Sequence, residues 1–137
     1  MKVLYLETSA LLTWLFNEPG ASKIMSSINH ADLIVTSDLL RIETARAIGR
    51  VLNENLITPE QHESLIRHFH EFLKSWFRMS IDESVINGAS ENFPMAPVRS
   101  LDAIHLATAL EYKKLYPELK MLTSDDRLLQ KTTALDL

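Results

Sequence analysis

The chain has 137 residues, of which 46% are hydrophobic and 23% charged, with 3 Gly and 5 Pro. These values are typical of one globular domain, 1–137, and exclude a disordered or collagen-like chain. The 14 basic and 18 acidic residues give a net charge of −4, so the overall basic field that draws many nucleic-acid binders to phosphate is missing. The chain has no cysteine, so any metal must be held by oxygen or imidazole ligands.

The amino-terminal segment is apolar from Val3 to Phe16 but is interrupted by Glu7. Residues 17–19, which follow it, lack the small-residue pattern of a signal-peptide cleavage site. No uninterrupted apolar stretch approaches the ~20 residues that span a bilayer. We therefore expect a soluble, cytoplasmic protein without a signal peptide.

Along the chain, short β-prone runs alternate with helical patterns. Strands are predicted at 2–6, 33–35, 77–81 and 119–123. Helices are predicted at 8–16, 21–29, 39–53, 59–74, 83–92 and 101–112, with a last helix opening at 125–126. Residues 93–98, which include two prolines, are predicted to be loop. Strands that alternate with helices favour an α/β domain with a mostly parallel sheet and helices on both faces.

Polar residues mark several of the predicted helix starts. The start at Thr58 is the most complete, because Pro59 takes the first helical position and Gln61 closes a capping box. Elsewhere the candidate caps are Thr36, Ser37 or Asp38, then Asp82, Ser100 and Asp125.

Two acids follow strands of the predicted sheet. Glu7 comes directly after the first strand, and Asp125 lies at the end of the last one. Ligand sites of open parallel sheets form at the carboxyl ends of the strands, so both acids are candidates for such a site. The alternative for each is an acid in a first helical turn that interacts with the helix dipole.

Two further acids lie on helix faces that are otherwise apolar. Glu43 shares its face with Leu39, Leu40 and Ala47, and needs a partner there, either in a functional site or in a salt bridge with Arg46 or Arg50. Asp102 opens a helix that is apolar nearly all round. Its only polar stripe consists of Asp102, His105 and Thr108.

Glu7, Glu43, Asp102 and Asp125 would repel one another if they met without a cation. A divalent metal is the economical solution. Ligation by oxygen alone suits Mg²⁺ or Mn²⁺, and Mg²⁺ held by carboxylates typically acts on phosphate groups.

At these residues the sequence resembles the PIN-domain family, and especially the VapC-type toxins of toxin–antitoxin pairs. The resemblance covers essentially the whole chain, and its most specific motif is the helix of Asp102. The matching segments are 6–11 (LETSAL), 41–45 (RIETA), 99–109 (RSLDAIHLATA) and 123–125 (TSD).

The resemblance implies a three-layer α/β/α fold and a metal-dependent endoribonuclease. Glu7, Glu43, Asp102 and Asp125 would be the catalytic carboxylates that hold one or two Mg²⁺ or Mn²⁺ ions. The hydroxyls of Thr8, Ser9 or Thr123 would orient waters or the phosphate, or else cap helices. The resemblance also implies an RNA substrate, a homodimer, and a VapB-type antitoxin whose tail enters the acidic cleft.

The family pattern has Asp at position 7, where this chain has Glu. The extra methylene displaces the carboxylate, and Mg²⁺ demands near-ideal octahedral geometry. Activity is therefore expected to be lowered. The alternative is a PIN-like protein that binds metal, RNA or its partner without turnover. A haloacid-dehalogenase-type phosphatase or a response-regulator receiver fits less well, because each requires a second acid near Glu7.

The histidines and the aromatic run are interpreted mainly as structural residues. His62, His68 and His70 lack metal-binding spacing and are interpreted as surface or packing residues. His105 either packs in the core or hydrogen-bonds a ligand of the metal. The aromatic run of 69–77 is predicted to pack in the core.

The four candidate acids also change the meaning of the net charge. Without them, 14 of the 18 acidic residues remain against 14 basic ones, so the rest of the chain is neutral. Bound cations would then meet the phosphate in place of a basic surface.

Overall fold

The computed structural model describes residues 1–95 and 97–137. It contains a four-stranded sheet in the order β3-β2-β1-β4, and all three strand pairings are parallel. The strands are β1 Val3–Leu6, β2 Leu33–Ser37, β3 Phe77–Met79 and β4 Lys120–Leu122. The prediction of a parallel sheet is confirmed.

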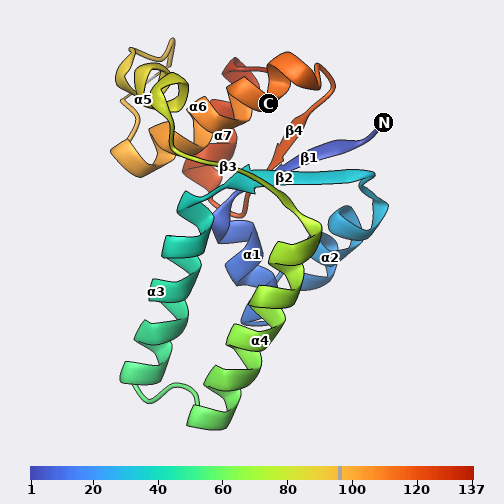
Figure 1. The fold of residues 1–137 in the computed structure, drawn as a ribbon, viewed down its shortest axis with the longest axis vertical. Coiled ribbons are helices and arrows are strands. Elements are labelled where there is room, and N and C mark those ends of the chain that lie inside the picture. Colours follow the sequence, from blue (N-terminus) through green and yellow to red (C-terminus); the bar gives the residue numbers. More distant parts are fainter. Residues whose placement is uncertain (96) are drawn as a thin grey trace.

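Helices cover both faces of this sheet, as Figure 1 shows. The helices are α1 Thr8–Leu15, α2 Ala21–His30, α3 Leu39–Asn53, α4 Pro59–Ser75, α5 Glu83–Ser90, α6 Ser100–Leu115 and α7 Asp126–Ala134. Those from α1 to α4 lie on one side and those from α5 to α7 on the other, which gives three layers (Figure 1). Within residues 1–95 and 97–137, none of the helices combines the length and apolar character needed to cross a bilayer.

The alternation of side chains along β1 explains why there are two cores. Val3 and Tyr5 belong to the cluster that contains Leu106 and Tyr112 of α6. Leu4 and Leu6 point the other way, into a cluster with residues of α1 to α4. Because both faces of β1 are covered, its sequence is a continuous apolar run.

The aromatic run at 69–77 is mostly core, as predicted. Phe69 and Trp76 are buried, and Phe72 stacks on Trp76 with ring centroids 5.5 Å apart. Phe77 is the exception, because 63% of it is exposed on the edge strand β3.

The end of β2 and the cap of α3 differ from the prediction. Thr36 and Ser37 were candidate caps, but both belong to β2, where they pair with Arg78 and Met79 of β3. Only Ser37 also caps α3, through an Oγ that accepts from the Leu39 amide at 3.0 Å, while the Asp38 side chain makes no capping bond. The extra strand length depends on pairing with β3, whose residues lie 42 positions further along the chain, so local patterns cannot predict it.

The other corrections are smaller. Ser100 is not a cap: it is the first residue of α6, which runs one turn past the predicted end to Leu115. Strands β3 and β4 and helix α5 are shorter than predicted. Residues 93–95 and 97–98 of the predicted loop have no helix or strand, and Ala96 lies outside the described residues.

The predicted capping box at the start of α4 is confirmed. The Gln61 amide donates to Thr58 Oγ at 3.1 Å, and the Thr58 amide donates to Gln61 Oε1 at 2.8 Å. We expect Thr58→Ala to lower the free energy of unfolding by about 1 kcal/mol, because one amide of the first turn loses its acceptor. Urea denaturation followed by circular dichroism measures this. Thr133→Ala, at an exposed position inside α7, is the control and should have a smaller effect.

Candidate metal-binding edge of the sheet

Glu7 follows β1 directly and caps α1 at the carboxyl edge of the sheet. Its Oε2 accepts from the Ser9 amide at 3.1 Å and from Thr123 Oγ at 2.7 Å, and the Ser9 hydroxyl is also in hydrogen-bond contact with it. Only 6% of the residue is exposed. Glu7 is therefore tied to its own helix and to the segment that follows β4.

Glu43 projects from α3 toward α1 and α6. Its Oε1 accepts from Thr8 Oγ at 2.6 Å and lies 2.6 Å from His105 Nε2. Burial alone would raise the pKa of Glu43, but the hydrogen bonds from His105 and Thr8 hold that pKa below its usual value. Among the described residues no ion pair joins Glu43 to Arg46 or Arg50, so the salt bridge considered from the sequence is absent.

His105 lies between Glu43 and Tyr5 and is only 1% exposed. Tyr5 Oη is 2.7 Å from Nδ1 of the same ring. The sequence analysis missed Tyr5, although a tyrosine in an otherwise aliphatic buried strand is a signal in itself. Its hydroxyl needs a partner inside the core.

Asp125 caps α7, as predicted. Its Oδ1 accepts from the amides of Arg127 at 2.9 Å and Leu128 at 3.3 Å. Its own amide donates to Thr123 Oγ at 3.1 Å, so the same threonine contacts both Asp125 and Glu7.

Asp102 lies in the first turn of α6 and is partly exposed. Within the described part of the chain its carboxylate makes neither a hydrogen bond nor an ion pair, so no protein contact holds it. It lies one helical turn before His105, which contacts Glu43.

These contacts connect Asp125, Glu7 and Glu43 along one edge of the sheet, while Asp102 has no recorded side-chain contact among the described residues and only shares a helix with His105. Thr123 links Asp125 to Glu7, while Thr8, next to Glu7, links to Glu43, whose other partner is His105 on the helix of Asp102. In residues 1–95 and 97–137, however, no three Asp, Glu or His side chains are gathered closely enough to hold one ion.

The donor chemistry at this edge fits a hard divalent cation. Among the described residues, the recorded hydrogen bonds to the side-chain carboxylates of Glu7, Glu43 and Asp125 involve one oxygen of each, and the Asp102 carboxylate has none. No Lys or Arg in the described ranges forms an ion pair with any of the four. Each acid therefore keeps an oxygen and its charge for another ligand.

Comparison with known proteins agrees with this fold. The family model described as PIN domain matches residues 4–134. The chain belongs to the PIN-domain family. All four acids lie within the matched residues.

Within the PIN-domain family the most informative relatives are of the VapC type. Ribonuclease VapC35 of Mycobacterium tuberculosis (strains CDC 1551 / Oshkosh and ATCC 25618 / H37Rv) is 34% identical over 137 residues, covering 98% of this chain and 93% of the relative. Ribonuclease VapC47 of strain CDC 1551 / Oshkosh is 33% identical over 116 residues, covering 82% of this chain and 78% of the relative. The resemblance inferred from the motifs is thereby confirmed.

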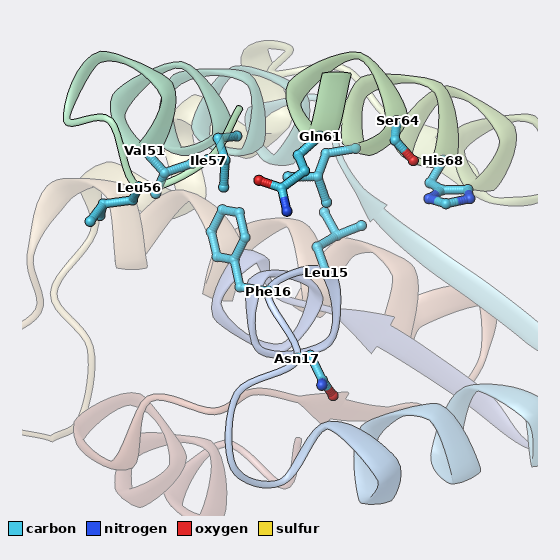
Figure 2. A pocket seen from close by; sticks show the side chains of 10 residues that line it. Leu15, Phe16, Asn17, Val51, Leu56, Ile57, Gln61, Ser64 and His68 are labelled. Atoms are coloured by element: carbon cyan, nitrogen blue, oxygen red, sulfur yellow. The ribbon is translucent and has the colours of Figure 1, made fainter. Parts of the chain in front are cut away.

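The PIN domain also has an apolar hollow away from these acids. It has a volume of about 470 Å³ and lies between the end of α1 and the connection from α3 to α4, as Figure 2 shows. Phe16, Ile57 and Leu65 are among its lining side chains, and none of the four acids is. The hollow is therefore separate from the candidate site.

Proposed function

We propose that this PIN-domain protein is a metal-dependent endoribonuclease, the toxin of a VapBC-type toxin–antitoxin pair. The observation that supports this most is the linked set of Asp125, Glu7 and Glu43 at the carboxyl edge of the sheet, with Asp102 one helical turn from the His105 that contacts Glu43. Each keeps an oxygen without a protein partner among the described residues. The names of the VapC relatives, both ribonucleases, support RNA as the substrate.

In this proposal Glu7, Glu43, Asp102 and Asp125 hold Mg²⁺ or Mn²⁺. Such an ion, when bound, would supply Lewis-acid chemistry: it would lower the pKa of a water and stabilise negative charge on the scissile phosphate. Thr8 and Thr123 hold one oxygen of Glu43 and of Glu7, which limits the rotation of both carboxylates. Asp102 has no such restraint, so it can turn toward an ion at little cost.

The test is incubation of the purified protein with RNA and Mg²⁺ or Mn²⁺, with and without EDTA. We expect phosphodiester cleavage that requires the ion, and metal-dependent binding of RNA. Cleavage or RNA binding that continues undiminished in EDTA would contradict the proposal.

Glu7→Asp is expected to raise the cleavage rate roughly 10-fold, since Asp is the family residue at this position and the shorter side chain alters where the carboxylate lies. Asp also caps helices well, so α1 should remain intact. Single-turnover cleavage of a labelled RNA measures the change. An unchanged or lower rate would show that Glu is the adapted residue in this chain.

A second candidate function is binding without turnover. It is favoured by the contacts of Glu7. All three hydrogen bonds recorded for this side chain are accepted by Oε2, and one of them comes from Thr123. Retention of RNA in the presence of Mn²⁺, with no product after long incubation, would support this alternative.

The proposed partners are a VapB-type antitoxin and a second copy of the chain. Residues 1–137 are proposed to form one domain, and the protein is proposed to act in the cytoplasm. A basic side chain of the antitoxin would pair with the unneutralised acids at the sheet edge. Exposed apolar side chains such as Ile42, 56% exposed, and Leu101, 51% exposed, support an association surface near the starts of α3 and α6. Sedimentation of the chain alone and with the antitoxin tests both.

A further inference from the structure

A line of three polar side chains crosses the interior from β1 to α3. Tyr5 is fully buried and His105 is 1% exposed, whereas the Glu43 side chain is 25% exposed. Tyr5 Oη lies 2.7 Å from His105 Nδ1, and His105 Nε2 lies 2.6 Å from Glu43 Oε1. The line runs from the core of the sheet to the acidic edge.

Both nitrogens of the His105 ring have a partner. An ionised carboxylate only accepts hydrogen bonds, so Nε2 of His105 carries a proton and donates a hydrogen bond to Glu43. The Tyr5 hydroxyl lies 2.7 Å from Nδ1 and is also in hydrogen-bond contact with the Thr108 side chain. The contact with Tyr5 therefore fixes the plane of the imidazole, whichever of the two atoms donates.

The Tyr5 hydroxyl keeps its proton. Burial, followed by the negative charge of Glu7, raises the pKa of the Tyr5 hydroxyl well above its usual value. No phenolate therefore forms beside His105.

We infer that His105 and Tyr5 are positioning residues for Glu43: they hold its Oε1 so that Oε2 is presented at the acidic edge of the sheet. This inference rests on the proposed function, in which Glu43 is a metal ligand. Thr8 supplies the second donor to the same Oε1. In the described residues Oε2 has no hydrogen bond, so it is the oxygen left for an ion or its waters.

An imidazole suits this task because its planar ring is in contact at both nitrogens, with Tyr5 at Nδ1 and with Glu43 at Nε2. Orientation by a partner behind the ligand is how proteins commonly fix side chains that hold metals.

A merely structural role is the competing explanation, and two observables separate it from positioning. The first is the tautomer of His105 in the metal-free protein, measured from the ¹⁵N shifts of its ring together with nuclear Overhauser contacts to Glu43. The second is the affinity for Mn²⁺, measured by calorimetry at one pH.

The variants are chosen so that folding does not decide the outcome. Tyr5→Phe removes one oxygen and keeps the ring, so the core remains filled. Its control is Tyr112→Phe, because Tyr112 lies in the same core with its ring centroid 6.4 Å from that of Tyr5 and has no recorded contact with His105. His105→Leu removes the donor to Glu43, and His105→Gln restores an N–H donor of similar reach.

We expect a proton on Nε2 in the unaltered protein and in Tyr112→Phe, and changed ring ¹⁵N shifts in Tyr5→Phe because Nδ1 loses its partner. Mn²⁺ affinity should fall about 10- to 100-fold in His105→Leu, less in Tyr5→Phe, and recover in part in His105→Gln. Equal Mn²⁺ affinity in the unaltered protein and a folded Tyr5→Phe with unchanged ring shifts would overturn the inference. If the unaltered protein binds no Mn²⁺, the proposed function fails, while the ring shifts still decide whether Tyr5 and His105 orient Glu43.

Discussion

Asp102→Asn is expected to reduce RNA cleavage about 100-fold or more, with little loss of stability. The variant removes a full negative charge from the proposed ion-binding edge, and the amide that replaces it is a weaker ligand for a hard cation. Asp102 has no recorded hydrogen bond or ion pair among the described residues, so its fold contribution is limited to the first-turn dipole of α6, about 1 kcal/mol at most. The measurement pairs single-turnover cleavage with urea denaturation.

Asp32→Asn is the matched control for this variant. Asp32 is exposed and precedes β2, so it lies at the amino edge of the parallel sheet, opposite the candidate site. Its carboxylate accepts from the exposed Lys2 amide at 2.6 Å. We expect cleavage by this variant to equal that of the unaltered protein. Equal cleavage by Asp102→Asn would remove Asp102 from the proposed site.

Leu106→Ala should lower the free energy of unfolding by about 2 to 5 kcal/mol. Leu106 is completely buried in the core between α6 and the sheet, and its truncation leaves a cavity that the parallel strands close only partly. Since single domains are typically stable by about 5 to 15 kcal/mol, this one change removes a large share of the total. Chemical denaturation followed by circular dichroism gives the value.

Leu115→Ala is the matched control, because the same substitution is made on the same helix at a position that is 68% exposed. Its effect should be within about 0.5 kcal/mol of zero. Similar losses in the two variants would mean that α6 is not packed against the sheet as described.

Much of the fold could be predicted from the sequence because its signals are local. The capping box at Thr58, the caps at Asp82 and Asp125, and the apolar pattern of α6 all depend on residues within one or two turns of each other. The boundary errors have the opposite origin. Thr36 and Ser37 are strand residues because β3 pairs with them, and β3 is distant in the chain.

The candidate site divides in the same way. Motif order and helical spacing are sufficient to identify Glu7, Glu43, Asp102 and Asp125 as candidates and to predict that Asp125 follows a strand. They are not sufficient to identify the partner of Glu43, because Arg46 and Arg50 lie close enough along the helix to form a salt bridge with it. The structure pairs it with His105 and Thr8 instead.

By itself, then, the sequence determined the α/β class, the helix starts, the four candidate acids and the family, because each follows from residue types and short spacings along the chain. Only the tertiary structure decided which oxygen of the Glu7, Glu43 and Asp125 carboxylates accepts hydrogen bonds, and from which residues. The contacts responsible join residues 62 positions apart for His105 and Glu43, 100 for Tyr5 and His105, and 116 for Glu7 and Thr123. Such contacts exist only after the sheet has assembled and both of its faces have been covered, so no local pattern encodes them.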